Sequence, residues 1–136
     1  MRDEQYEPLK IEKKWQKVWA DQNKFEPKPS DKQFSIVIPP PNVTGSLHMG
    51  HALEHSIIDV LVRYKRLNGF ETLWVPGTDH AGIITQLLVE KELSNQGTSK
   101  EVLGRDKFID EVWKWKETSG ENISNQMKTL GMSCDW

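Results

Sequence analysis

The sequence has little cysteine, no long apolar run and almost no excess of charge of either sign. Cys134 is the only cysteine among 136 residues, which excludes an internal disulfide framework and fits a reducing compartment. No apolar run approaches the length that spans a bilayer, and the polar start of the chain is unlike a signal or transit peptide. Eighteen Lys and Arg against 20 Asp and Glu argue against a protein built mainly to coat nucleic acid. A soluble, cytoplasmic protein is expected.

Residues 1–32 are predicted to form a helical extension. Apolar residues recur at helical spacing between Pro8 and Gln22, which predicts a helix with one buried face. The residues of that face are Ile11, Trp15, Val18 and Trp19. The next ten residues contain two prolines and are predicted to be a loop.

Residues 33–136 alternate between predicted strands and helices and are expected to form a single folding unit. The run FSIVI at residues 34–38 is short, β-branched and apolar, which favours a strand covered on both faces. A second strand is predicted at residues 72–75, and helices at residues 47–67, from about residue 81, and at residues 100–130 with an interruption near Gly120. The apolar positions of the first two helices are Leu53, Ile57, Leu61 and Tyr64, and then Ile83, Ile84, Leu87 and Leu88 on one side.

This strand–helix–strand–helix order predicts an α/β fold, the first part of a doubly wound parallel sheet of the Rossmann-like, nucleotide-binding kind. A long helical segment follows it. Because such crossovers return the chain in the same direction, both strands end at one edge of the sheet. The loops Pro39–Ser46 and Pro76–His80 should therefore lie together at that edge, where open α/β sheets bind their ligands.

Two histidines begin the helix that follows the first loop. His48 and His51 stand at positions i and i+3, so they share a face at a helix N-terminus, where free N–H groups favour anions. Imidazoles placed there can donate hydrogen bonds to a phosphate and its transition state, and Gly50 leaves room for a base or ribose. One alternative is that the pair are ordinary surface residues of a helix start. Another is a zinc site with His55, which the lack of a nearby closing carboxylate or cysteine disfavours.

The second loop places Asp79 at the same edge. A carboxylate there can pair with a cationic group of a small substrate. Thr78 or Asp79 is equally suited to cap the third helix. The spacing alone leaves these two interpretations open.

Two segments resemble the class I aminoacyl-tRNA synthetases. PPPNVTGSLHMGHAL (Pro39–Leu53) resembles the signature region of the class, and its PPPN and VTG elements resemble the valine enzymes in particular. WVPGTDHAGIITQ (Trp74–Gln86) resembles their second signature, and the likeness covers nearly the whole chain from Tyr6. The departures are Met49, where the class often has Ile, and Ile84, where these enzymes usually have Ala.

The resemblance implies a role for individual residues. His48 and His51 are the implied catalytic pair, which would bind the ATP phosphates and stabilise adenylyl transfer. The implied ATP-binding residues are Thr44, Gly45, His48, Gly50 and His51, and the implied amino-acid-binding residues are Pro40, Asn42 and Asp79, with Asp79 and the Pro40 carbonyl on the α-ammonium. The signature region comprises Pro41, Asn42, Val43, Thr44, Gly45, Ser46, Leu47, His48, Met49, Gly50 and His51.

The resemblance also implies a reaction and its partners. L-valine and ATP, with Mg²⁺ on the phosphates, would give valyl-adenylate, which is then transferred to tRNA(Val). The lysine-rich KMSKS signature of the class does not occur among these residues. The chain is therefore expected to be the N-terminal part of a longer synthetase, inactive or very weakly active alone, and to bind no metal of its own and no membrane. The alternatives are a smaller HxGH-type nucleotidyltransferase and a noncatalytic, synthetase-derived binding fragment.

Overall fold

The computed structural model describes residues 6–136, so the first five residues of the expected helical extension lie outside it. The chain forms two compact units. The first contains the described residues up to Ile38, Ala52–Pro76 and Met127–Trp136; the second contains Pro39–His51 and Gly77–Gln126. Each unit is built from segments that are distant in sequence. The predicted domain boundary between residues 32 and 33 stays a prediction.

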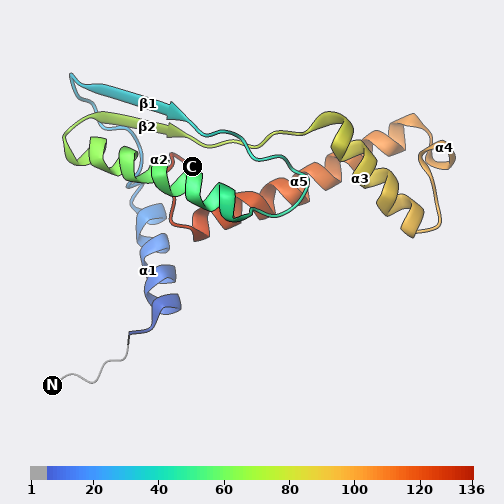
Figure 1. The fold of residues 1–136 in the computed structure, drawn as a ribbon, viewed down its shortest axis with the longest axis horizontal. Helices are drawn as coiled ribbons and strands as arrows, with labels where there is room; N and C mark the ends of the chain where they lie inside the picture. Colours follow the sequence, from blue (N-terminus) through green and yellow to red (C-terminus); the bar gives the residue numbers. More distant parts are fainter. Residues whose placement is uncertain (1–5) are drawn as a thin grey trace. The chain divides into compact units, whose positions relative to one another are not determined.

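A pair of parallel strands forms the sheet of the first unit. β1 (Gln33–Val37) and β2 (Glu71–Val75) lie side by side, with Phe34 opposite Thr72 and Ile36 opposite Trp74 (Figure 1). The Ile38 N–H continues the ladder by donating to the Val75 carbonyl. Trp74 and Ile38 are fully buried. The predicted parallel pairing of two strands across a helix is confirmed.

One face of β1 is exposed. The expectation that this strand is covered on both faces is therefore wrong. Gln33, Ser35 and Val37 are exposed, Val37 by 68%. Phe34 and Ile36 point to the other, half-buried face. A short apolar run fits burial on one side as well as on two, so the sequence pattern could not distinguish them.

Helix α1 (Pro8–Asp21) forms as predicted, but only the end of its apolar face is covered. The Trp19 ring lies 5.5 Å from the Phe25 ring and 5.4 Å from the Arg63 guanidinium, whereas Trp15 is 46% exposed. The prediction of a buried face is therefore wrong for Ile11 and Trp15, which are exposed, and Val18 and Trp19 are only half-buried. Periodicity identifies an apolar face but not how much of it meets a partner.

Helix α2 (Met49–Leu67) begins two residues later than predicted and runs alongside the strands, where Lys65 lies 5.5 Å from the Phe34 ring. Its buried residues are His55 and Val62. The predicted apolar positions have the helical spacing but are exposed: Leu53, Ile57, Leu61 and Tyr64.

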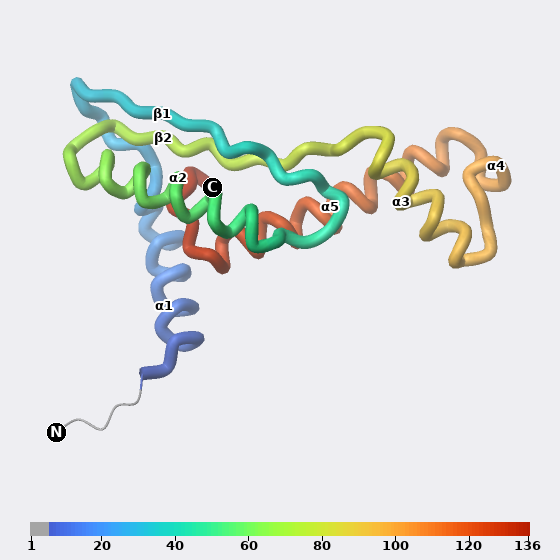
Figure 2. The backbone as a smooth tube through the Cα atoms, in the orientation of Figure 1, coloured from blue at the N-terminus to red at the C-terminus, as the bar shows by residue number. Residues whose placement is uncertain are grey.

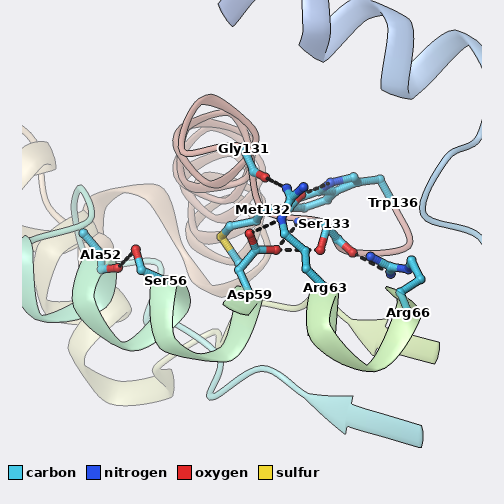
Figure 3. A network of polar contacts seen from close by, with 9 residues as sticks. All are labelled: Ala52, Ser56, Asp59, Arg63, Arg66, Gly131, Met132, Ser133 and Trp136. Carbon is cyan, nitrogen blue, oxygen red and sulfur yellow. Dashed lines mark hydrogen bonds and ion pairs between the residues drawn. The ribbon is translucent and has the colours of Figure 1, made fainter. Parts of the chain in front are cut away.

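A polar network joins α2 to the C-terminal segment Gly131–Trp136 (Figure 3). Asp59 accepts hydrogen bonds from the Ser133 N–H at 2.9 Å and from its hydroxyl, and its other oxygen pairs with Arg63 Nε at 2.6 Å. Arg63 and Arg66 donate to the carbonyls of Gly131 and Ser133 at 2.8 and 3.0 Å. This network holds the C-terminal segment against α2.

Cys134 lies inside the segment that this network holds. Its side chain is fully buried, and the Asp135 N–H donates to the Trp74 carbonyl of β2. Burial, reinforced by the Asp59 carboxylate, raises the pKa of the Cys134 thiol to about 12. The cysteine is therefore a buried core residue of the first unit.

The second unit contains α3 (Gly82–Asn95), the short α4 (Lys100–Leu103) and most of α5 (Arg105–Thr129) (Figure 2). α3 and α5 together line a hollow of about 340 Å³. The buried side of α3 is Thr85, Val89 and Leu93. The apolar side that the sequence singled out is exposed at Ile83, Ile84 and Leu87. A helix that is apolar on several sides does not disclose which side its neighbour will cover.

The helical segment after residue 100 breaks at Gly104, and the predicted interruption near Gly120 is wrong. Gly104 has φ +76°, a conformation that favours glycine, and it separates α4 from α5. α5 continues through Gly120. A Cβ at that position would lie 3.9 Å from Val43 and from Thr78, so this glycine marks a contact with the two loops.

No helix within residues 6–136 combines the length and the apolar character needed to cross a membrane.

Candidate functional site

The two loops predicted to share an edge are joined through their main chains. Asn42 and Asp79 form an isolated parallel bridge, in which the Val43 N–H donates to the Asp79 carbonyl at 2.9 Å. The Asp79 N–H in turn donates to the Pro41 carbonyl at 2.8 Å. The prediction that these loops lie together is confirmed. The bridge places Asn42 and Asp79 side by side.

Helix α5 supports the first loop at two points. Trp115 Nε1 donates to the Val43 carbonyl at 2.9 Å, and the Leu47 N–H donates to Gln126 Oε1 at 2.9 Å. Gly120 lies between them in sequence, in van der Waals reach of Val43. Sequence reasoning missed Trp115 and Gln126. Their spacing with the buried Ile123 would have placed them on one helical face, but nothing local identified the partner of that face.

His48 and His51 cap the start of α2 reciprocally. His48 Nδ1 accepts from the N–H groups of Gly50 and His51, at 3.1 and 3.4 Å, while His51 Nδ1 accepts from the His48 N–H at 3.2 Å. This is the geometry of a capping box, with two imidazoles in place of the usual hydroxyl and carboxylate. Because Nδ1 is an acceptor in both rings, the hydrogen-bond network assigns the proton of each neutral ring to Nε2.

The two imidazoles stack on each other at the surface and not in the core. Their ring centroids are 3.9 Å apart at an interplanar angle of 23°. His48 is exposed and His51 is half-buried, so the alternative in which they are ordinary surface residues explains their exposure but not their mutual hydrogen bonds. An Nε2–H donor on each ring suits them to bind an anion at a helix N-terminus.

Gly50 has a second role that its sequence position did not indicate. A Cβ at this residue would lie 2.9 Å from Cε1 and 3.0 Å from Nδ1 of the His48 ring. Side chains are essentially never that close, so the ring could not keep its place above any other residue. Gly50 therefore allows the imidazole cap to form.

Asp79 takes part in the turn before α3 without being the N-cap of that helix. Its Oδ1 accepts from the Ala81 N–H at 3.0 Å, and the N-cap itself is Ala81 with φ +54°. Asp79 is exposed. One carboxylate oxygen is thus used in the turn, and the other has the chemistry to accept from a cation.

The remaining predicted residues fall into two groups. Pro40 and Asn42 are exposed beside Asp79, whereas Thr44 is half-buried and Gly45 has open space around it in the turn that leads to the histidines. Pro41 and Val43 are buried, Ser46 and Met49 are exposed, and Leu47 is half-buried. The structure thus gathers one set around Asp79 and another at the start of α2, connected by the segment Val43–Leu47.

Metal ligation was disfavoured from the sequence, and the prediction that no zinc is bound stays a prediction. In the part of the chain from residue 6 onward, no group of three or more His, Cys, Asp or Glu is arranged to hold a metal ion. His55, the third histidine of that alternative, is fully buried.

A comparison with known proteins identifies the family. The family described as tRNA synthetases class I (I, L, M and V) matches residues 14–136. The chain is a member of the class I tRNA synthetases. Valine--tRNA ligase of Pelagibacter ubique (strain HTCC1062) is 59% identical to it over 136 residues, which is 100% of this chain and 16% of that protein. Valine--tRNA ligases of Carboxydothermus hydrogenoformans and Geobacter sulfurreducens are 55% and 56% identical, each over 96% of this chain and 15% of the relative.

A solved synthetase structure agrees with the fold. LeuRS of Agrobacterium radiobacter K84 agnB2, in a ternary complex with tRNA and LeuAMS, matches with a TM-score of 0.73 at 25% identity, over 97% of this chain and 15% of that one. The predicted α/β class with a parallel sheet is confirmed. This synthetase chain spans about one sixth of the length of the curated relatives it matches.

Proposed function

We propose that this chain is the part of a valine--tRNA ligase that holds the ATP phosphates and the amino acid during formation of valyl-adenylate. In that reaction the valine carboxylate attacks the α-phosphorus of ATP and pyrophosphate leaves. The terminal ribose hydroxyl of tRNA(Val) then attacks the aminoacyl carbonyl, and AMP leaves. Mg²⁺ enters with ATP as part of the substrate. The observation that carries the proposal is the reciprocal histidine cap at the start of α2.

The histidine pair supports the phosphate part of the proposal. Two Nε2–H donors at a helix N-terminus match the negative charge that develops as the α-phosphorus passes through its transition state. Their Nδ1 atoms are held by main-chain N–H groups, so the donors are positioned before the substrate arrives. Preorganised donors of this kind avoid reorganisation during the reaction. Thr44 and Gly45, in the adjoining turn, would contact the phosphates and the ribose of ATP.

Asp79 supports the amino-acid part. Its carboxylate stands beside Asn42 through the main-chain bridge, so a charge partner for an α-ammonium lies next to residues that can line a side-chain pocket. The Pro40 carbonyl would be a second acceptor for that ammonium. Valine as the substrate rests on the identity of 53–59% to valine--tRNA ligases, which extends over both loops.

The first test is amino-acid-dependent exchange between ATP and labelled pyrophosphate, measured on the complete reading frame that contains this chain. Valine should support exchange, and isoleucine, leucine and methionine should support far less. Exchange that prefers another of these amino acids would overturn the assignment to valine. Absence of exchange with all four would overturn the proposed function.

The second test separates catalysis by the histidines from their role as helix caps. The double variant His48→Asn with His51→Gln keeps side chains that suit the N-cap and the third helical position but removes both imidazoles. Its thermal unfolding should match the parent, while kcat for exchange should fall at least about 100-fold, as on loss of a transition-state donor. Parent-like kcat would contradict the role of the pair.

A further inference from the structure

We propose that Trp115 and Gln126 of α5 are positioning residues for the adenylation site, each governing one end of the signature loop. This inference rests on the proposed function. Trp115 acts on the amino-acid end through Val43, and Gln126 acts on the phosphate end through Leu47. Neither side chain belongs to the segments whose sequence resembles a synthetase signature.

The two contacts bracket the turn that leads to the histidines. Trp115 Nε1 holds the Val43 carbonyl, and Gln126 Oε1 holds the Leu47 N–H, both at 2.9 Å. Eleven residues of helix separate the two side chains, a rise of roughly 16 Å, so the loop is fixed at two distant points of one rigid element. Thr44, Gly45 and Ser46 lie between those points.

The Trp115 contact controls the neighbourhood of Asp79. Val43 is fully buried, its carbonyl accepts from Trp115, and its N–H donates to the Asp79 carbonyl. The indole and the second loop therefore hold the two main-chain polar groups of the same residue, its carbonyl and its N–H. Loss of the indole N–H would allow Val43 to move, and with it the alignment of Asn42 and Asp79.

The Gln126 contact controls the start of α2. Leu47 directly precedes His48, whose ring accepts from the N–H groups of Gly50 and His51. Fixing the Leu47 N–H fixes the direction in which the chain enters the cap. A displacement of about 1 Å at reacting groups can cost 100-fold in rate, so this bond should be felt in catalysis more than in substrate binding.

Substitutions at the two positions should change different kinetic constants in the exchange assay on the complete protein. Gln126→Met, which keeps the side-chain size but removes the acceptor, should lower kcat about tenfold with KM for valine changed less than about twofold. Trp115→Phe, which removes the indole N–H, should raise KM for valine about fivefold with a smaller change in kcat. A merely structural role would instead lower thermal stability and change both kinetic constants alike.

Conservative and matched variants complete the design. Gln126→Glu retains an oxygen acceptor and should keep kcat within about threefold of the parent. Trp15→Phe changes a tryptophan of α1 that is 46% exposed, and Gln22→Met removes an exposed glutamine at the end of α1; both should leave kcat and KM unchanged. Parent-like constants in Gln126→Met and Trp115→Phe, or losses that only follow melting temperature, would overturn the positioning role.

A measurement without turnover distinguishes failure of this inference from failure of the proposed function. The ¹⁵N shifts of the His48 and His51 ring nitrogens report which nitrogen carries the proton. They should change in Gln126→Met and stay as in the parent in Gln22→Met and Gln126→Glu. An inactive parent protein would overturn the proposed function, and these shifts would still decide the positioning role: unchanged ring nitrogens in Gln126→Met would overturn it.

Discussion

The imidazole rings of His48 and His51 stack with their centroids 3.9 Å apart, and the ring nitrogen of each accepts the main-chain N–H of the other residue. The pair is therefore a single structural unit whose members fix one another. Such an arrangement caps a helix and at the same time presents two Nε2–H donors. Disturbing either ring should affect both.

Gly50→Ala should separate the stacked rings of His48 and His51 without unfolding the protein. The added Cβ would stand 2.9 Å from the His48 ring, which must move and give up its bonds to the two N–H groups. Loss of the cap destabilises the protein by about 1 kcal/mol, and alanine stabilises the helix by a similar amount relative to glycine. The melting temperature should therefore change little. We expect kcat for exchange to fall at least about tenfold. An unchanged His48 ring spectrum in Gly50→Ala would contradict the steric argument.

Asp59→Ala should destabilise the protein far more than removal of a surface ion pair. Asp59 has 19% of its side chain exposed and receives two hydrogen bonds from Ser133 as well as the Arg63 guanidinium. Leaving these groups without a partner should cost about 2–4 kcal/mol in urea unfolding. Asp21→Ala breaks the similarly spaced pair with Lys17, 58% exposed at Asp21, and should cost less than about 0.5 kcal/mol. Equal losses would show that the network does not hold the C-terminal segment.

Gly120→Ala should stabilise the protein, whereas Gly120→Leu should destabilise it. Glycine inside α5 costs about 1 kcal/mol relative to alanine, and an alanine Cβ would sit at an ordinary 3.9 Å from Val43 and Thr78. The larger leucine would push against both loops and cost about 1–3 kcal/mol. Thermal unfolding of the two variants checks the prediction. A destabilised alanine variant would mean that the loops lie closer to α5 than the structure places them.

Cys134 should make stability fall at alkaline pH. Burial raises the pKa of its thiol from 9.0 to about 12, so the folded state binds a proton that the unfolded state releases. The contribution is fully present below about pH 9 and is lost toward pH 12, at up to about 1.4 kcal/mol per pH unit. Urea unfolding between pH 8 and 11 should show this slope in the parent and a smaller slope in Cys134→Ala. Rapid reaction of the native thiol with an aromatic disulfide reagent at pH 8 would contradict its burial.

Local patterns predicted the elements better than they predicted their faces. β1 and β2 lie within one or two residues of the predicted strands, and α1, α2 and α3 within two of the predicted starts. The buried side of α3 was not identified, because Ile83, Ile84 and Leu87 form as apolar a stripe as Val89 and Leu93 do. The covering of β1 and Trp15 was overestimated for the same reason. Whether a face of a helix or strand is buried depends on which element packs against it, and that element is distant in sequence.

The two glycines of the C-terminal helical segment illustrate the same limit. Gly104 ends α4 because it adopts φ +76°, whereas Gly120 remains helical and accommodates Val43 and Thr78. By local helix propensity alone, both glycines are equally strong helix breakers. The difference between them comes from what packs against each.

The two strands, the starts of the first three helices and the edge at which the two loops meet follow from the sequence, because periodicity, turn residues and parallel crossovers are local or topological constraints. That Trp115 and Gln126 hold the signature loop, across separations of 72 and 79 residues, is apparent only from the three-dimensional structure. The same holds for the reciprocal cap that the two histidines form above Gly50. Hydrogen bonds between distant segments satisfy main-chain groups that a loop cannot satisfy for itself, and no spacing rule encodes which side chain will supply them.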